Sequence, residues 1–241
     1  MSNKQTFFLR RYAWLPRFLK KRGKIFFYYA VSKLSGRRYW KFAGVKLGFI
    51  TAYHHGVARE MGTDFHEDPP EYFNEWVVDA KDANLIYDIG GYNGLYGIAA
   101  ALANPHAAVT IFEPDSINAE QCRQNIKLNG VEARCSVSQI AVAGSTGVST
   151  FAMRGMTGGK LGEGETKITC TKLDDLPTPQ LIKLDVEGQE TAILTNAPKT
   201  LSRKPVIFME LHYWAPDKEK LWAALHDFSA KEFDDRHYRL S

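Results

Sequence analysis

A glycine-rich turn between two apolar runs is the feature that most constrains what this chain can fold into. Residues 84–89 read NLIYDI, residues 90–94 read GGYNG, and residues 95–103 read LYGIAAALA before Asn104 and Pro105 end the pattern. A short apolar run, a glycine turn and an alanine-rich stretch predict a strand, a tight turn and a helix. The chain therefore contains at least one strand-turn-helix unit.

The same pattern repeats along the chain. Residues 108–112 (AVTIF) predict a second strand, and residues 116–128 predict a second helix that ends at Asn129-Gly130. Further predicted elements are a strand at 135–142, a hairpin of 147–153 with 167–171 around a glycine-rich loop, a strand at 180–186, a helix at 189–201, a strand at 205–211 and a helix at 218–231. Apolar strands that alternate with helices predict an α/β fold with a mostly parallel, Rossmann-like sheet and helices on both faces.

Acidic residues stand at the ends of these predicted strands. They are Asp88, Glu113, Asp185, Glu187 and Glu210. Ligands of such sheets bind outside the carboxyl ends of the strands, so we expect these side chains to face one crevice.

The turn has the spacing D-x-G-x-x-x-G from Asp88 through Gly90 to Gly94. A dinucleotide site needs G-x-G-x-x-G, and an acid here would repel phosphates. Asp88 suits a ligand with an amino group, such as the methionine part of S-adenosylmethionine, with a purely structural turn as the alternative. Glu113 can accept both hydroxyls of an adenosyl ribose or, alternatively, favour the start of the next helix. The predicted cofactor-binding residues are Asp88, Gly90, Gly91, Asn93, Gly94, Glu113, Asn118 and Asp185.

Six strings follow one another in this sequence: YDIGGYNGLY at 87–96, FEP at 112–114, NIKLN at 125–129, TKLDDL at 171–176, IKLDVEGQE at 182–190 and ELH at 210–212. In this order they resemble the FkbM family of S-adenosylmethionine-dependent methyltransferases. The resemblance covers roughly residues 84–212, and it implies a class I methyltransferase fold and methyl transfer, usually to a hydroxyl. The acceptor implied is often a sugar, a glycolipid or another natural product. Sheets of this fold usually close with two more strands, whereas only residues 215–241 remain here, so the last strands are abbreviated or another chain completes the edge.

Catalytic candidates lie at the ends of two neighbouring predicted strands. Asp185 and Glu187 alternate on one strand, and Glu210 and His212 alternate on the next. Because a sugar hydroxyl is a poor nucleophile, we predict His212 as general base, with Asp185 or Glu210 holding its ring. Asp185 and Glu187 would orient the acceptor, while solvated acids and a structural histidine are the alternatives. Asp185, Glu187 and Glu210 could hold Mg²⁺ through oxygen ligands, but no metal site is predicted.

The charge is divided unevenly along the chain. Residues 1–59 carry 14 Lys and Arg and no Asp or Glu, which leaves 17 basic against 27 acidic residues in the remainder. We therefore divide the chain into a basic N-terminal arm, residues 1–60, and a methyltransferase domain, residues 61–241. The longest apolar cluster of the arm, residues 25–31, is too short to span a bilayer.

Aromatic residues are interspersed with the basic residues of the arm, for example Trp14, Phe18 and residues 26–29 (FFYY). A helical stretch of this kind fits an anionic membrane surface. RNA binding and packing of the aromatic residues on the body are the alternatives. We favour a membrane surface for residues 1–45 and do not predict a nucleic-acid partner.

Together these features predict an O-methyltransferase that uses S-adenosylmethionine. One alternative is N-methylation of RNA or protein, although an N-P-P-Y type tetrapeptide is absent. The other is a membrane-recruited binding module of the same fold without catalysis. Cys122, Cys135 and Cys170 lack paired spacing, so we expect a cytoplasmic protein, peripheral on the inner face of a membrane through its arm. The acceptor and the oligomeric state stay open.

Overall fold

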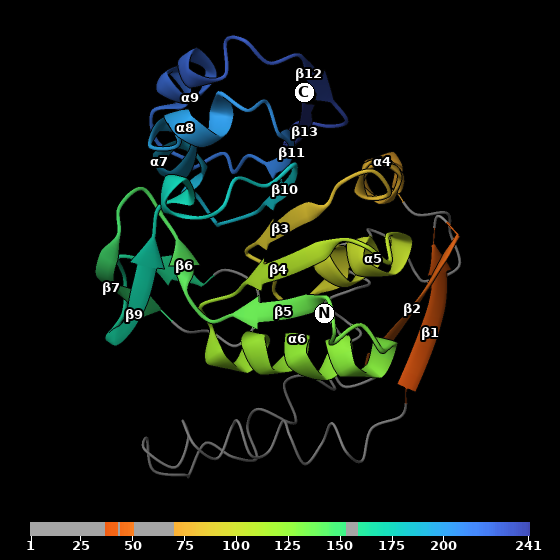
Figure 1. Ribbon diagram of the computed structural model, residues 1–241. Coiled ribbons are helices and arrows are strands. Elements are labelled where there is room, and N and C mark those ends of the chain that lie inside the picture. Colours follow the sequence, from red (N-terminus) through yellow and green to blue (C-terminus); the bar gives the residue numbers. More distant parts are fainter. Residues whose placement is uncertain (1–36, 43, 51–69, 153–158) are drawn as a thin grey trace, which may run out of the picture.

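The computed structural model describes residues 37–42, 44–50, 70–152 and 159–241, and Figure 1 shows a central sheet with helices around it. The sheet runs in the order β12-β13-β11-β10-β3-β4-β5. Its strands are β3 (Leu85–Ile89), β4 (Ala108–Phe112), β5 (Cys135–Ser138), β10 (Leu181–Leu184), β11 (Val206–Glu210), β12 (Ala230–Glu232) and β13 (His237–Leu240). The strands from β11 to β5 are parallel, whereas β13 is antiparallel to both of its neighbours. The predicted α/β fold with a mostly parallel sheet is confirmed.

Helices cover both faces of this sheet. Among the described residues, the helices of one face are α4 (Glu71–Ala80), α5 (Leu95–Ala103) and α6 (Ser116–Asn129), and those of the other are α7 (Glu190–Thr195), α8 (Pro198–Leu201) and α9 (Lys218–Ala224). Adjacent residues of β11 show why the strand is apolar throughout. Phe208 packs with Trp76 and Ile98 in one core, while Met209 packs with Ile193 and Leu221 in the other. A strand that is buried on both faces has no polar alternation.

The chain reverses its direction of winding between β3 and β10. From β3 it proceeds to β4 and β5 on one side, and β10 and β11 follow on the other side. The carboxyl ends of the strands at such a point form the usual ligand crevice of an open α/β sheet.

A smaller sheet lies beside the carboxyl ends of the main strands, in the order β6-β9-β7-β8 (Figure 1). Its strands are β6 (Ala141–Val142), β7 (Gly147–Ala152), β8 (Lys160–Leu161) and β9 (Thr166–Thr171). The predicted hairpin is confirmed, because β7 and β9 pair antiparallel. The predicted strand over 135–142 is wrong in its extent, since β5 and β6 belong to different sheets. The chain leaves the main sheet after Ser138, and Ala141 pairs with Cys170 of β9.

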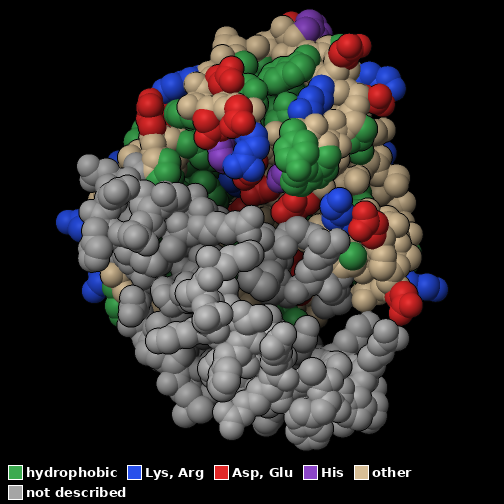
Figure 2. All heavy atoms as spheres, turned by 180° about the vertical axis from the view of Figure 1, so that it is seen from behind, with side chains coloured by type: hydrophobic (Ala, Val, Ile, Leu, Met, Phe, Trp, Pro, Cys, Tyr) green, Lys and Arg blue, Asp and Glu red, His purple; other side chains and the backbone are tan. Residues whose placement is uncertain are grey.

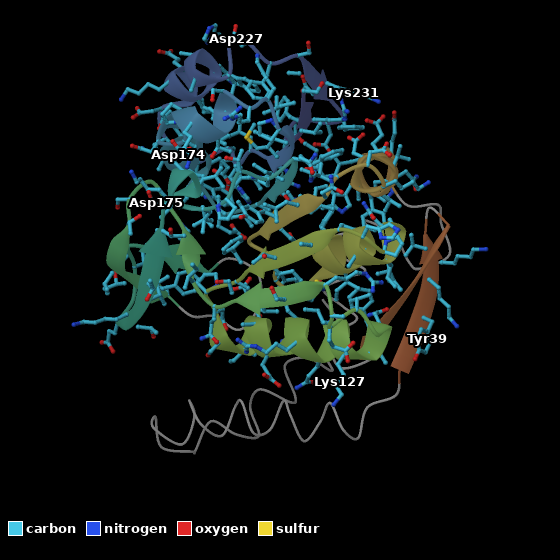
Figure 3. All side chains as sticks on the ribbon, viewed as in Figure 1. Tyr39, Lys127, Asp174, Asp175, Asp227 and Lys231 are labelled. Carbon is cyan, nitrogen blue, oxygen red and sulfur yellow. The ribbon has the colours of Figure 1, made fainter. Side chains whose placement is uncertain are left out.

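The predicted helix over 189–201 consists of two short helices, α7 and α8. Pro198 stands at the first position of α8, where its missing N–H costs nothing. Asp174, in the 3₁₀ helix η2 (Leu173–Asp175), accepts hydrogen bonds from the backbone N–H groups of Lys199 and Thr200 at 2.9 and 2.8 Å. Figure 3 places Asp174 on the segment next to this helix. Asp174 therefore caps the start of α8, and the chain forms two helices here where one was predicted.

The predicted last helix, 218–231, is also wrong in its extent. The helix α9 ends at Ala224, and β12 and β13 then complete the edge of the sheet, as abbreviated strands. All three residues of β12 are exposed, so this edge strand needed no apolar residues and gave no strand pattern in the sequence. Lys231 of β12 pairs with Glu71 of α4 at 2.7 Å and also with Glu75 (Figure 3).

Part of the predicted helical arm is a β-hairpin. It consists of β1 (Arg37–Phe42) and β2 (Val45–Ile50). Leu47 and Phe49 are fully buried in the same core as Trp76. The side chain of Asn129 accepts a hydrogen bond from Gly48 N at 2.7 Å and donates one to Gly48 O at 2.8 Å. The body of the protein therefore begins before residue 61.

Residues 1–36 and 51–69 lie outside the described residues, so the interpretation of this basic segment stays a prediction. None of the helices in the described part of the chain is both long and apolar enough to cross a bilayer.

Candidate active site

A cavity of about 270 Å³ opens at the carboxyl ends of β3, β4, β10 and β11. The charged and histidine side chains that line it are Glu113, Asp115, Asp185, Glu187, Glu210, Arg236, His212 and His237. Figure 2 shows acidic, basic and histidine side chains interspersed with apolar ones on the described part of the rear face. All the predicted strand-end acids except Asp88 line the cavity.

Gly90 forms one wall of this cavity and fixes the turn after β3. Its φ is +84°, and a Cβ atom there would lie 1.7 Å from the backbone oxygen of Asp185. Its N–H donates to Phe112 O at 2.9 Å. Only glycine fits both this conformation and this contact, so the turn holds the ends of β3, β4 and β10 together.

The other predicted residues of the turn stand behind the cavity. Asp88 is buried and accepts a hydrogen bond from Gly97 N at 2.8 Å, at the first turn of α5. Burial raises the pKa of Asp88 to about 6, although the Gly97 N–H and the charge of Lys183 lower it. Asn93 accepts a bond from Leu95 N at 3.1 Å. Asp88, Gly91, Asn93 and Gly94 therefore shape the turn and do not line the cavity.

Glu113 lies at the end of β4 and does line the cavity. Its two carboxylate oxygens accept hydrogen bonds from Tyr92 N and Asp115 N, both at 2.8 Å. Burial raises the pKa of Glu113 to about 8, against the effect of these two N–H donors. The N-terminus of α6 is capped instead by Asp115, which accepts a bond from Ile117 N at 2.8 Å. Glu113 is thus not needed as the helix cap, and Asn118 of α6 lies beside it in the wall.

Of the four predicted catalytic residues, the three acids surround the fourth, His212. Its Nε2 atom lies 3.5 Å from Glu187, 3.9 Å from Asp185 and 3.9 Å from Glu210. The ring of Trp214 lies against the imidazole, with the ring centroids 4.7 Å apart. The sequence prediction that these side chains face one crevice agrees with this geometry.

The residue that holds the imidazole is Glu190, to which the sequence analysis gave no role. Its Oε1 atom lies 2.8 Å from His212 Nδ1, closer than Asp185 or Glu210 to any ring nitrogen. The signal was present, because Glu190 ends the string IKLDVEGQE. Burial lowers the pKa of His212, but the hydrogen bond to Glu190 and the charge of Asp185 outweigh it and raise the pKa above its usual value.

Cationic side chains lie beside two of the acids in this cluster. Lys183 is buried and lies 3.5 Å from Asp185, and Arg236 lies 3.0 Å from Glu210. Partial burial raises the pKa of Asp185 to about 7, although Lys183 lowers it. Burial also acts to raise the pKa of Glu210, but the hydrogen bond with His237 and the charge of Lys183 hold it well below its ordinary value. Arg236 and His237 were missed because no strand was predicted beyond residue 231.

The family of the chain follows from residues 88–240, which match the model of the methyltransferase FkbM domain. The chain belongs to this family. The FkbM match extends to the end of β13, so the two short terminal strands are part of the domain. A search of curated proteins found no match.

Solved structures that align with this chain include methyltransferases. A methyltransferase from Geobacter sulfurreducens aligns with a TM-score of 0.50 and 14% identity, over 78% of this chain and 86% of that chain. Cofactor-bound Rv0187 from MTB aligns with a TM-score of 0.49 and 15% identity, over 78% and 87% of the two chains. A precorrin-6y C5,15-methyltransferase from Geobacter metallireducens GS-15 aligns with a TM-score of 0.44 and 16% identity, over 70% of this chain and 84% of that chain. The alignment with the Geobacter sulfurreducens methyltransferase and the order of the main sheet together show that the FkbM domain has the class I methyltransferase fold.

One group of ligand atoms in the FkbM domain is close enough for a metal ion. Asp185, Glu210 and His212 each offer one atom, and these atoms lie within 4.8 Å of one another among the described residues. However, Lys183 and Arg236 already place positive charge beside the two carboxylates. We therefore assign no metal to this cluster.

Proposed function

We propose that this FkbM domain transfers a methyl group from S-adenosylmethionine to a hydroxyl of a saccharide-type acceptor, either free or on a lipid or natural product. The observation that carries the proposal is the position of His212. Its Nε2 faces a cavity whose other wall is the Gly90 turn and Glu113. A candidate base and a candidate cofactor-binding wall therefore line the same cavity at the switch point of the sheet.

The donor half of the site is formed by the ends of β3 and β4. Gly90 brings backbone close to a ligand without a Cβ atom, and Glu113 presents acceptor oxygens for ribose hydroxyls. Each carboxylate oxygen has two lone pairs, so the bonds from Tyr92 and Asp115 leave acceptor capacity. When bound, S-adenosylmethionine supplies an activated methyl group on a sulfonium.

The donor assignment is tested by calorimetry with S-adenosylmethionine. Loss of hydrogen bonds to a charged group typically costs about 1.5 to 3 kcal/mol, so at a pH above the raised pKa of Glu113, where this group is a carboxylate, Glu113→Ala should weaken binding about ten- to a hundredfold. Glu132→Ala, a change of the same kind at an exposed position, is the matched control and should bind as the wild type does. Absence of binding to the wild-type protein would reject the donor.

His212 acts on the acceptor half. As the acceptor oxygen bonds to the methyl carbon, His212 Nε2 takes the hydroxyl proton, and the carbon–sulfur bond breaks with its electron pair left on sulfur. The products are the methyl ether, a neutral thioether and an imidazolium on His212. Asp185 and Glu187, 3.9 and 3.5 Å from Nε2, are placed to accept hydrogen bonds from the acceptor and orient it.

The rim of the cavity supports a sugar as the acceptor. Trp214 is 40% exposed, and its Nε1 donates to Glu187 O at 3.3 Å, which fixes the ring beside the carboxylates. Tyr213 next to it is 78% exposed. An aromatic face beside carboxylate acceptors can pack on the apolar face of a sugar while its hydroxyls meet the carboxylates.

The acceptor is tested by transfer of labelled methyl groups to panels of saccharides, glycolipids, amines and RNA. We expect label in a methyl ether of a saccharide, and Trp214→Ala should raise the KM for that acceptor more than it lowers kcat. Label only on nitrogen would establish the N-methyltransferase alternative. Cofactor binding without transfer to any panel would favour the binding module.

A further inference from the structure

We propose that Glu190 is a positioning residue that holds His212 with Nδ1–H toward its carboxylate and leaves the Nε2 lone pair facing the acceptor. The inference rests on the proposed function and adds a residue to it. Glu190 does not line the cavity and would act only through His212.

The contact is built into the fold. Glu190 is fully buried at the start of α7, and its Oε1 atom lies 2.8 Å from His212 Nδ1. The same oxygen accepts a bond from Gly188 N at 3.1 Å. Gly188 has a φ of +99°, and a Cβ atom there would lie 2.8 Å from Trp214. Gly188 therefore lets the chain turn back, so that the Gly188 N–H orients the carboxylate of Glu190.

This geometry fixes the tautomer of the imidazole. A backbone N–H can only donate, so Oε1 of Glu190 accepts from Gly188, and as an ionised carboxylate Glu190 has no proton to donate to the ring. The Nδ1 atom at 2.8 Å must then carry the proton, and a neutral ring has its lone pair on Nε2. That atom faces the cavity, 3.5 to 3.9 Å from the acids there.

Glu190 differs from the other acids around the ring. The groups that face His212 are Asp185, Glu187, Glu210 and the Trp214 ring. Lys183 contacts Asp185, and Arg236 and His237 contact Glu210. In the described part of the chain, Glu190 pairs with no Lys or Arg, and its Oε2 has no hydrogen-bond partner. Its negative charge is thus directed at the ring, where it stabilises the imidazolium formed as the proton is taken.

The kinetic test is a double-mutant cycle of Glu190→Gln with His212→Ala. The amide oxygen of Gln can keep the bond from Gly188, so the fold is retained and the charge is lost. We expect the rate of methyl transfer to fall about tenfold or more, with the affinity for S-adenosylmethionine within about threefold of wild type. In the His212→Ala background the second substitution should have no further effect on the rate. Glu219→Gln, the same change in the first turn of α9, is the control and should be neutral.

A further loss of rate in the His212→Ala background would overturn the proposal, because Glu190 would then act other than through the ring. Full activity of Glu190→Gln would overturn it as well.

The second measurement needs neither donor nor acceptor. Nitrogen-15 NMR of the intact wild-type protein, read at the alkaline plateau of a pH titration where the ring is neutral, should show His212 with a protonated Nδ1 and an unprotonated Nε2. In Glu190→Ala the two nitrogens should shift toward averaged values. A protonated Nε2 in the wild type would refute the proposal, even if Glu190→Ala does not fold and even if methyl transfer is confirmed.

Discussion

At the residue scale, the cavity contains one imidazole, His212, with Glu190 beside Nδ1 and Asp185, Glu187 and Glu210 near Nε2. If His212 is the base, His212→Ala should lower the single-turnover rate of methyl transfer at least about a hundredfold. Cofactor affinity should stay within about threefold, because His212 lies on the acceptor side of the cavity. A variant with the full rate would pass the role to Asp185 or Glu187.

The pH dependence of the rate has a definite sign. Burial lowers the pKa of His212, but Glu190 and Asp185 raise it above the usual 6.5. A base must be neutral, so kcat should rise with pH and level off above this raised pKa. Stability has the opposite trend, because a raised pKa in the folded state contributes stability below the unfolded value that is lost as pH rises through the folded value. A rate that falls with rising pH between about 6 and 8 would contradict the assignment.

Residue patterns in the sequence located one side of this site and missed the other. Asp185, Glu187, Glu210 and His212 were found because acids at the ends of parallel strands must converge. Glu190 was missed since it lies beyond the turn, where only the backbone fold of Gly188 brings it back to the ring. The alternation of side chains along a strand does not predict that Glu190, beyond the strand end, contacts His212.

At the element scale, the turn after β3 is the most constrained part of the site. Gly90→Ala would put a Cβ atom 1.7 Å from Asp185 O at a φ of +84°, so we expect the protein to lose cofactor binding or to fail to fold. Gly130→Ala is the matched control, since Gly130 also has a positive φ but no atom within 4 Å of an added Cβ. That change should cost only about 1 to 2 kcal/mol, measured by urea unfolding. Equal effects of the two substitutions would mean that backbone strain alone matters.

The terminal strands make a second prediction about elements. Leu240 of β13 is fully buried against the core that contains Met209, although it is the second-last residue. Leu240→Ala should lower the free energy of unfolding by about 2 to 5 kcal/mol in urea titrations, whereas Ser241→Ala should change it by less than about 0.5 kcal/mol. A small effect at Leu240 would show that the edge of the sheet is not closed as described.

Elements were predictable where burial imposed a pattern. The parallel strands β3, β4, β10 and β11 are buried on both faces, and their apolar runs were found within one or two residues. The strand β12 is exposed throughout, and β5 and β6 are separated by only two residues but join different sheets. Which sheet a strand joins depends on tertiary contacts, and the sequence of the strand alone does not specify them.

At the scale of the whole molecule, the boundary between basic and acidic sequence near residue 60 does not coincide with the start of the folded domain. The hairpin β1–β2 packs on the body through Leu47, Phe49 and Asn129, so it belongs with the domain. Ahead of the hairpin, residues 1–36 of the predicted arm carry nine Lys and Arg and no acid. An arm with this composition ahead of an acidic body favours an anionic partner for the arm itself.

We propose an anionic membrane as that partner. Basic residues near such a surface contribute about 1 kcal/mol each, and the attraction is screened by salt. The full chain should therefore sediment with vesicles rich in phosphatidylserine at low salt and be released as salt rises, whereas neutral vesicles should not retain it. Reversing Lys20, Lys21 and Arg22 to Glu should abolish sedimentation, and thermal unfolding of the variant checks that its fold is retained. Reversal of Lys127 on α6 with Lys218 and Lys220 on α9 changes the net charge by the same amount and should leave sedimentation intact. Retention of the arm variant on the vesicles would reject the membrane role, and competition by RNA at equal salt would establish nucleic acid as the partner instead.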